Sequence, residues 1–369
     1  MRILILANND IGLYRFRKEL ILKLIPNNEV FISLPYGPFV EKLTDFGCRF
    51  IKTDISRHGT NPFSDARLLR FYKKIIKSIR PNVVLTYTIK PNIYGGIACT
   101  SLRVPFIANI TGLGNAVENK GLLQKIALAL YKKSLKKSFH VFFQNSNNLA
   151  FFMKHNIKIS NYSLLPGSGV NLKENMLETY PSDKDGLVFV TIGRILKDKG
   201  IKELLSSARI IKERHPNITF RIVGDMDGNY AKDVDDASRD GVIEYLGHRN
   251  DIHEIIKQSH ATIHPSYHEG TSNVLLETAA CGRPILASNV PGCNNTFDEE
   301  TGIGFEPKSV ESLVNAIETF VSLPLERKKE MGIRGRLKME REFDRRIVID
   351  AYVQIINKVE KENKINEAL

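Results

Sequence analysis

Ala261-Thr-Ile-His-Pro-Ser266, followed closely by Glu269-Gly-Thr-Ser-Asn-Val-Leu-Leu-Glu277, contains a strand, a loop and a helix in quick succession. The first run is rich in apolar and β-branched residues, which predicts a short strand that runs into a loop. Residues 273–280 predict a helix, with Thr271 or Ser272 as its N-cap. A strand that passes through a loop into a helix is the repeating element of an α/β fold.

The same alternation of short apolar runs and helical patterns extends over the whole chain. It predicts parallel sheets built from right-handed β-α-β units. We therefore expect two successive Rossmann-like α/β domains that face each other across a cleft. A final amphipathic helix is expected to cross back onto the first domain. The predicted strands are Ile3–Ala7, Val30–Leu34, Val83–Tyr87, Phe106–Asn109, Val141–Asn145, Leu187–Ile192, Thr219–Val223, Ile243–Leu246, Ala261–His264 and Pro284–Ala287, and the predicted helices include Leu13–Ile25, Ala66–Ile79, Leu122–Lys137 and Ile347–Val359.

The length of 369 residues allows two domains of ordinary size, each with its own core. We predict a first domain over residues 1–170, a second over 171–345, and a returning helix over 346–369. The polar stretch Asn171–Asp185 is the expected linker.

The composition is typical of a soluble globular protein, with 42% hydrophobic and 25% charged residues. No apolar run approaches the length that spans a bilayer, and the first residues predict a strand rather than a signal peptide. The four cysteines are scattered, without the spacing of a metal or redox motif. These features predict a cytoplasmic protein in a reducing compartment.

The positive charge is concentrated in the first part of the chain. Residues 1–170 carry 25 Lys and Arg against 8 Asp and Glu, a balance of +17, whereas the remainder carries 28 against 33, a balance of −5. The segment Gly121–Phe139 combines apolar positions with Lys132, Lys133, Lys136 and Lys137. It is either a basic amphipathic helix on an anionic membrane or a helix packed on the sheet with a solvated basic face. No nucleic-acid-binding motif accompanies the charge, so we expect no nucleic-acid partner.

The two glutamates that bound the opening stretch suggest a ligand. Glu269 is expected on the loop and Glu277 about one turn into the helix. Between them, Gly270 precedes the amides of Thr271, Ser272, Asn273 and Val274, which could bind an anion such as a phosphate at the start of the helix. An anion site flanked by two carboxylates suits a ligand that combines phosphates with many hydroxyls, such as a nucleotide sugar.

Basic residues follow the first strand of the second domain, in Thr191-Ile-Gly-Arg194-Ile-Leu-Lys-Asp-Lys199-Gly200. Open α/β sheets bind ligands at the carboxyl ends of their strands. There the planar guanidinium of Arg194 and the point charge of Lys199 would suit two adjacent phosphates. Two further runs, Arg221-Ile-Val-Gly224-Asp225 and Tyr245-Leu-Gly-His-Arg249, place glycines just after predicted strands, where the backbone can approach a ligand.

In this order, these motifs and the later Cys281-Gly-Arg-Pro-Ile285 resemble glycosyltransferase family 4, the retaining nucleotide-sugar transferases with the GT-B fold. The first domain resembles a subset that builds bacterial surface polysaccharides and lipid-linked glycans. This subset includes transferases that add N-acetylgalactosamine or a related sugar to an undecaprenyl-diphosphate-linked sugar. The motifs that carry the second resemblance are Tyr14-Arg-Phe-Arg17, Ser56-Arg57 with Asn61-Pro62, Thr88-Ile-Lys90-Pro91-Asn92-Ile-Tyr94-Gly95, and Asn109-Ile-Thr-Gly112-Leu-Gly114.

The resemblance implies a role for each matching residue. Arg194 and Lys199 would neutralise the diphosphate as charge grows on the leaving nucleotide. Glu269 would face the donor sugar, Glu277 would bind the ribose hydroxyls, and the amides of residues 271–274 would hold the distal phosphate. The remaining expected substrate contacts are Gly12 on the first loop, Arg17, Gly224 and Arg249.

One position departs from the family pattern. Many members carry a histidine in the first domain near the reacting sugar carbon, and the corresponding position here is Ile89. Lys90 is the substitute that we predict for this role. We expect neither a metal nor a cofactor: Asp225-Met-Asp227 is interpreted as a solvated turn, and Pro265 separates His264 from His268.

The resulting hypothesis is a retaining, metal-independent transferase at the inner face of the cell membrane. It would move a sugar, best N-acetylgalactosamine or a related hexose, from a UDP-sugar to an undecaprenyl-diphosphate-linked glycan during surface polysaccharide or protein-glycan assembly. Two alternatives remain: a nucleotide-sugar epimerase of the same fold, and a non-catalytic subunit that binds a nucleotide sugar.

Overall fold

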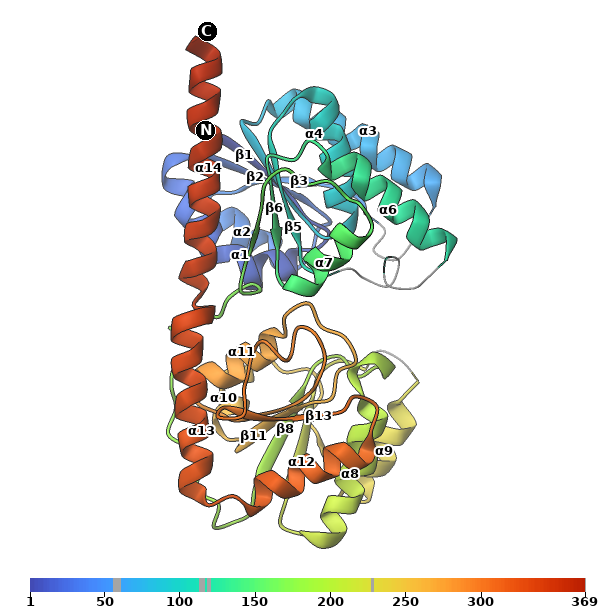
Figure 1. Cartoon of the computed structure of the whole chain (residues 1–369), viewed down its shortest axis with the longest axis vertical. Helices are drawn as coiled ribbons and strands as arrows, with labels where there is room; N and C mark the ends of the chain where they lie inside the picture. Colours follow the sequence, from blue (N-terminus) through green and yellow to red (C-terminus); the bar gives the residue numbers. More distant parts are fainter. Residues whose placement is uncertain (56–60, 113–116, 118–120, 227–228, 369) are drawn as a thin grey trace. The chain divides into compact units, whose positions relative to one another are not determined.

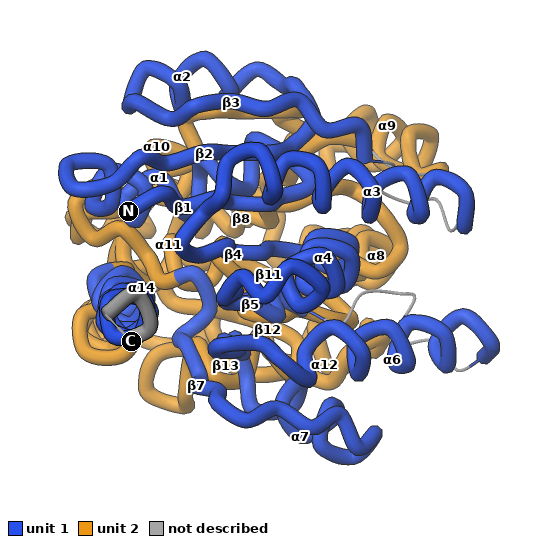
Figure 2. The backbone as a smooth tube through the Cα atoms, turned by 90° about the horizontal axis from the view of Figure 1, so that it is seen from above, with its two compact units in different colours: residues 1–168, 346–369 blue, residues 169–345 orange. Residues whose placement is uncertain are grey.

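The computed structural model describes residues 1–55, 61–112, 117, 121–226 and 229–368. The chain divides into two compact units. The first contains Met1–Ser168 together with Arg346–Leu369, and the second contains Gly169–Arg345, as the two colours of Figure 2 show.

The first unit is built on a parallel sheet, which has seven strands among the described residues, in the order β3-β2-β1-β4-β5-β6-β7. Its strands are β1 (Arg2–Leu6), β2 (Glu29–Leu34), β3 (Arg49–Lys52), β4 (Val83–Tyr87), β5 (Phe106–Ile110), β6 (His140–Phe143) and β7 (Tyr162–Leu164). Its helices are α1 (Asp10–Leu24), η1 (Ile25–Asn27), α2 (Val40–Asp45), α3 (Pro62–Ile79), η2 (Pro91–Gly95), α4 (Gly96–Leu102), α6 (Leu122–Leu135), α7 (Ser146–Lys154) and α14 (Arg345–Ala368).

Helices cover both faces of this sheet (Figure 1). Apolar side chains of α1, α2 and α14 pack on one face, and those of α3, α4, α6 and α7 pack on the other. The last helix is part of this core, because Val348, Tyr352 and Val359 are buried in it. The hydroxyl of Tyr352 also accepts a buried hydrogen bond of 2.7 Å from Asn109 Nδ2 on β5. The sequence-based prediction that the final helix returns to the first domain is confirmed.

The second unit repeats this plan with a parallel sheet that has six strands among the described residues, in the order β10-β9-β8-β11-β12-β13. Helices α8, α9 and α12 pack on one face, while α10 and α11 pack on the other. Its elements are β8 (Val188–Ile192), η3 (Lys197–Lys199), α8 (Ile201–Arg214), β9 (Thr219–Val223), α9 (Ala231–Arg239), β10 (Glu244–Tyr245), α10 (Ile252–Lys257), β11 (Ala261–His264), α11 (Asn273–Ala280), β12 (Ile285–Ser288), β13 (Gly302–Phe305), α12 (Val310–Ser322), α13 (Leu325–Lys338) and η4 (Met339–Phe343).

Strand order reverses once in each sheet, between β1 and β4 in the first and between β8 and β11 in the second. At such a switch point the loops after the two central strands leave in opposite directions and open a crevice at the carboxyl edge. The loops that follow β8 and β11 contain Arg194, Lys199 and Glu269. The topology therefore brings these predicted site residues to one edge of the second sheet.

Two helices of the first unit begin where an asparagine side chain caps them, which the spacing of apolar residues did not predict. Helix α1 begins at Asp10 because Asn9 Oδ1 accepts a hydrogen bond of 2.6 Å from Gly12 N. Gly12 therefore lies in the first turn of a helix, and the expectation that it belongs to a loop was wrong. Helix α3 likewise begins at Pro62 because Asn61 caps it.

The polar segment expected to be a linker, Asn171–Asp185, contains neither helix nor strand. It is anchored within the second unit, where Tyr180 donates a hydrogen bond of 2.7 Å to the His260 carbonyl. Among the helices of the described residues, none is long and apolar enough to cross a membrane.

One core histidine is held in its neutral form. His140 on β6 is buried, and its Nε2 lies 3.0 Å from Ser163 Oγ on β7. Burial, with a smaller contribution from the charge of Lys358 on α14, lowers the pKa of His140 to about 4.

This shift predicts a pH-dependent stability. The unfolded chain takes up a proton on His140 below about pH 6.5, whereas the folded protein does so only near pH 4. The stabilisation is therefore complete above the unfolded pKa and is lost progressively as the pH falls towards the folded value. We expect His140→Gln to flatten this part of the pH dependence of the free energy of unfolding, measured by urea denaturation. His268→Gln, at an exposed histidine, is the control; an unchanged slope in His140→Gln would contradict the prediction.

Candidate active site

The loops after β8, β9 and β10 are joined by backbone hydrogen bonds that continue beyond the strands. Gly193 N donates to Val223 O, Ile195 N to Asp225 O, and Gly224 N to Gly247 O, each at 2.9 Å. These bonds hold the exposed Arg194 between two fixed neighbours. A Cβ at Gly224 would lie 1.9 Å from Gly193 O, so this predicted contact residue is a glycine because the two loops approach so closely.

The turn that carries Lys199 is packed against the segment after β11. Tyr267 N donates a hydrogen bond of 2.8 Å to Asp198 O. Gly200 ends the turn with a φ of 65°, and a Cβ there would lie 2.1 Å from Pro265 O. Arg194, Lys199 and His264 line the same small pocket, of about 20 Å³, which has room for about one water molecule. The structure therefore brings the two predicted basic residues together.

Glu269 is the centre of the polar network at this edge. Its Oε1 accepts hydrogen bonds from Lys199 Nζ, from His264 Nε2 at 2.9 Å and from Ser266 Oγ at 2.8 Å. The side chain is only 15% exposed. Burial alone would raise the pKa of Glu269, but the hydrogen bond and charge of His264, together with the charge of Lys199, lower it well below its usual range. The site therefore holds a permanent carboxylate beside an ammonium group.

Ser272, one of the two predicted N-cap residues, directly precedes helix α11, but its side chain does not cap the helix. No side-chain hydrogen bond reaches the helix amides from Ser272, whose Oγ instead lies 3.1 Å from His264 Nε2. The amides at the start of an α-helix have no acceptor within the helix. The Oδ1 of Asn273 is also buried without a partner among the described residues. The start of α11 thus has hydrogen-bonding capacity that a ligand could use.

The other predicted residues of this stretch lie around the same helix start. Thr271 is buried and its Oγ1 donates to Gly270 O at 3.0 Å. Val274 packs partly against a small apolar cluster beneath the helix. Glu277 is the fifth residue of α11 and is half-buried.

Arg249 lies on the exposed loop that precedes α10. Its Nε donates to Asp251 Oδ1 at 2.8 Å. The neighbouring His248 places Nδ1 3.1 Å from Asp225 Oδ2. The loops after β9 and β10 are thus linked by side chains as well as by backbone.

In the first unit, two of the predicted residues have protein partners. Lys90 Nζ lies 2.8 Å from Asp65 Oδ1, and Tyr94 donates to the other oxygen of the same carboxylate at 2.8 Å. Arg17 is only 4% exposed. Its guanidinium lies 5.0 Å from the centre of the Tyr87 ring. Arg17 thus packs within the core beneath α14, and Lys90 belongs to a half-buried ion pair.

Some motif residues lie outside the part of the chain that the structure describes. They are Ser56, Arg57, Leu113, Gly114 and Asp227.

Three features at the edges of the two sheets were not predicted: the roles of His264 and Ser266, and the backbone conformation of Thr88. His264 and Ser266 both donate hydrogen bonds to Glu269 and so orient it. The available signal in the sequence was a histidine at the end of a predicted strand, five residues before a glutamate. At the first sheet, Thr88 follows β4 with a φ of 71°. This conformation is unusual for a β-branched residue, and such backbone strain is found preferentially at functional sites.

Gly200 provides a test of how the Lys199 turn is held. Gly241 has a similar φ of 70°, but a Cβ added there would meet no atom within 4 Å, whereas one added at Gly200 would collide with Pro265 O. Alanine at either position incurs about 1 kcal/mol for the left-handed backbone. We expect Gly200→Ala to lower the free energy of unfolding by at least about 1 kcal/mol more than Gly241→Ala does. Equal losses in chemical denaturation would contradict the packing described above.

Two family models match the chain. "Glycosyl transferase 4-like" matches residues 2–145, and "Glycosyl transferases group 1" matches residues 173–338. The chain is 28% identical over 384 residues to the N,N'-diacetylbacillosaminyl-diphospho-undecaprenol alpha-1,3-N-acetylgalactosaminyltransferase of Campylobacter jejuni, covering 98% of this chain and 100% of that protein. It is 26% identical to the UDP-Gal:alpha-D-GlcNAc-diphosphoundecaprenol alpha-1,3-galactosyltransferase of Escherichia coli, covering 80% and 81% of the two chains.

Among solved structures, Anabaena HepE in complex with UDP and glucose superposes with a TM-score of 0.78 at 16% identity, over 97% of this chain and 99% of that one. This likeness supports the fold. The two family models together span most of the chain, which therefore belongs to the family 4 glycosyltransferases, with the GT-B fold of two parallel-sheet α/β domains.

Proposed function

We propose that this glycosyltransferase moves a sugar from a UDP-sugar to an undecaprenyl-diphosphate-linked glycan, with retention of anomeric configuration and without a metal. The observation that carries the proposal is the gathering of Arg194, Lys199 and the ionised Glu269 at the switch-point edge of the second sheet. A nucleotide sugar requires cationic side chains that bind its diphosphate and carboxylates that accept hydrogen bonds from its hydroxyls. HepE, which shares the fold, binds UDP and glucose.

In this proposal the second unit binds the donor. Arg194 and Lys199 contact the diphosphate, and amides at the start of α11 hold its distal phosphate. Of residues 271–274, Ser272 already donates its amide to Gly292 O at 3.0 Å, so Asn273 and Val274 supply the phosphate contacts. Glu269, fixed by His264 and Ser266, faces the sugar. Glu277 binds the ribose hydroxyls, and Asn273 Oδ1 would gain a partner from a ligand hydroxyl. Gly224 and Arg249 lie on loops of the same edge and would contact the nucleotide.

The proposed reaction needs no enzymic nucleophile. The bond between the anomeric carbon and the phosphate oxygen breaks, and both of its electrons stay on the departing UDP. The acceptor hydroxyl oxygen forms its bond to the same face of that carbon, and its proton passes to the leaving phosphate. Arg194 and Lys199 stabilise the charge that develops on the diphosphate, which is the type of interaction that contributes most to many enzymic rate enhancements.

The acceptor is inferred from the relatives. The Campylobacter jejuni and Escherichia coli enzymes are named for diphospho-undecaprenol-linked acceptors and transfer N-acetylgalactosamine and galactose. We propose the same acceptor class here, bound by the first unit through Gly12, with Lys90 assisting near the reacting carbon. N-acetylgalactosamine or a related hexose is the proposed sugar, in the assembly of a surface polysaccharide or a protein-linked glycan.

A lipid-linked acceptor requires access to a membrane, and α6 supports such a surface. One face of this helix packs in the core through Ala127, Tyr131 and Leu135. Its other positions expose Leu122 by 75% and Ile126 by 49%. Exposed lysines follow at the end of the helix: Lys132, Lys133, Lys136 and Lys137. A helix with this division can bury apolar side chains at an anionic interface while its lysines contact headgroups. We propose peripheral association with the inner face of the cell membrane.

Removal of one phosphate-binding cation tests the transfer reaction. We expect Arg194→Ala to lower kcat about 10²-fold with a UDP-sugar and a short-chain polyprenyl-diphosphate sugar, because the charge on the leaving diphosphate loses one counter-charge. Arg209→Ala removes an exposed arginine of the same unit, which pairs with Asp240 instead, and should retain wild-type turnover.

Product analysis by mass spectrometry distinguishes the alternatives. An extended glycolipid supports the transferase. Conversion of the donor to its epimer without an acceptor would favour the epimerase, and binding without turnover would favour a non-catalytic subunit. Equal rates for wild type and Arg194→Ala would contradict the proposed site.

Vesicle binding tests the membrane surface. Replacing Lys132, Lys133 and Lys136 by Gln should weaken partition onto vesicles rich in phosphatidylglycerol about 10²-fold, at about 1 kcal/mol for each charge. The control replaces three exposed lysines of the second unit, Lys173, Lys184 and Lys232. Wild-type binding should weaken at high salt because exposed charges are screened. Binding that is insensitive to both salt and the α6 substitutions would contradict the proposal.

A further inference from the structure

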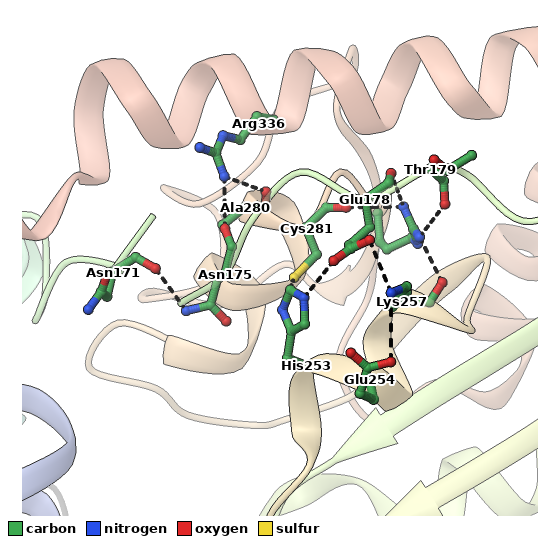
Figure 3. Close-up of polar contacts among 11 residues, drawn as sticks. Asn171, Asn175, Glu178, Thr179, His253, Glu254, Lys257, Ala280, Cys281 and Arg336 are labelled. Atoms are coloured by element: carbon green, nitrogen blue, oxygen red, sulfur yellow. Dashed lines mark hydrogen bonds and ion pairs between the residues drawn. The ribbon is translucent and has the colours of Figure 1, made fainter. Parts of the chain in front are cut away.

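The carboxyl-terminal end of α11 is held by two buried or half-buried arginines. Arg336 Nη1 donates to Ala280 O at 3.0 Å, and Arg283 Nη1 donates to Cys281 O at 3.0 Å. Arg283 also donates to the carbonyls of Thr179 and Lys257, at 2.8 and 2.7 Å. Figure 3 shows the Thr179 and Lys257 segments close to this end of the helix. Cations at this end complement the helix dipole, whose positive end is the proposed phosphate site.

His253 on α10 lies between this helix end and the segment before β8 (Figure 3). Its Nδ1 is 3.2 Å from Cys281 Sγ, and its Nε2 is 2.9 Å from Glu178 Oε1. Cys281 is 0% exposed, and this burial raises the pKa of its thiol to about 12. The sulfur is therefore protonated, so that S–H donates to Nδ1 while Nε2–H donates to Glu178. One imidazole thus contacts both groups.

The same contacts exclude a more obvious interpretation. Cysteine, histidine and glutamate in hydrogen-bonded order resemble the nucleophile, base and orienting group of a covalent catalyst. A nucleophilic cysteine must be an accessible thiolate, whereas Cys281 is fully buried and its thiol pKa is raised. The cluster of Glu178, His253 and Cys281 is therefore structural. We call it the His253 bracket, because it links the segment before β8, helix α10 and the carboxyl-terminal end of α11.

The bracket acts on the site through a single helical turn. Cys281 N donates to Glu277 O at 3.1 Å, so the residue held by His253 also closes the last turn of the helix that bears Glu277. Glu178 N donates in turn to Cys281 O at 3.3 Å. Asn273 and Val274 at the start of α11 and Glu277 belong to one short helix, so a shift at its carboxyl end displaces both parts of the proposed site.

We propose that His253 is a positioning residue for nucleotide binding: through Cys281 it fixes α11, and so sets the placement of Glu277 and of the amides that hold the distal phosphate. This inference rests on the proposed function, because it assigns the bracket to the UDP site. The inference predicts that the affinity for the donor and for UDP depends on His253. Turnover at saturating donor should not depend on it, because Arg194, Lys199 and Glu269 are held by other contacts.

Three substitutions and a matched control test the proposal. His253→Ala removes both bonds of the imidazole. His253→Asn places an amide near the position of Nδ1 and can still meet Cys281, whereas His253→Gln reaches the position of Nε2 and can still meet Glu178. The control is His215→Ala, because His215 lies 2.8 Å from Glu318 in the same unit, on elements other than α11. The dissociation constant for UDP is measured by calorimetry, KM and kcat by transfer assay, and folding by the thermal midpoint.

We expect His253→Ala to raise the UDP dissociation constant and the donor KM about 10-fold while kcat stays within about 2-fold. His253→Asn should restore most of the affinity, His253→Gln less, and His215→Ala should match wild type. If wild-type protein binds no UDP, the proposed function fails, and the role of the bracket fails with it. If wild type binds UDP and His253→Ala binds equally well, or if His215→Ala weakens binding as much, only the positioning role is overturned. Should His253→Ala not fold, the comparison of Asn with Gln decides, and equal affinities of these two would overturn the role of Cys281.

Discussion

The ligand edge of the second unit depends on one half-buried carboxylate oxygen. Glu269 Oε1 is the common acceptor for a lysine from the turn after β8, a histidine at the end of β11 and a serine from the following loop. Each donor comes from a backbone segment that is already fixed by its own contacts. Removal of the Glu269 carboxylate would leave the half-buried Lys199 ammonium without this counter-ion, and removal of the ammonium would leave a half-buried carboxylate. The two charges therefore hold each other at the place where the parallel topology opens a crevice.

Helix α11 connects this carboxylate to the rest of the unit. Its start follows the Glu269 loop, and Ser272, which could have capped it, lies against His264 instead. Its end is closed by arginines and by the His253 bracket, which extend to the irregular segment around Glu178. A short helix of this kind has little stability of its own. Its position is determined by the groups at its two ends.

The sequence was informative where strands are buried on both faces and where residues close in the chain form a motif. The central strands β1, β4 and β8 were predicted because their runs are mostly apolar, and β11 because its short run contains alanine and β-branched residues. The strands that were missed, β3, β7 and β13, all lie at sheet edges. Edge strands are short, with polar residues or glycine, so their sequences do not show a buried run.

The same distinction applies to the site. The Arg194–Lys199 turn and the Glu269–Glu277 stretch are local patterns, and their order along the chain together with the family resemblance indicated a site. The contacts of His253 with Glu178 and Cys281 join residues 75 and 28 positions apart, and a single sequence contains no signal for such pairs. Arg17 shows a limit of such local patterns, since a basic residue in a motif can be buried against a tyrosine ring instead of facing a ligand.

The return of α14 to the first unit has a consequence for how the chain is made. Val348, Tyr352, Ile355, Ile356 and Val359 belong to the core on one face of the first sheet. On the ribosome, these side chains emerge only after the whole of the second unit has been synthesised. The second unit, whose residues 169–345 are contiguous, can complete its core while translation continues, whereas the first unit has only α1 and α2 on this face of its sheet until α14 is synthesised. The unit that is synthesised second can thus complete its core first, and the part of the first sheet that α14 will cover is a surface that chaperones can protect.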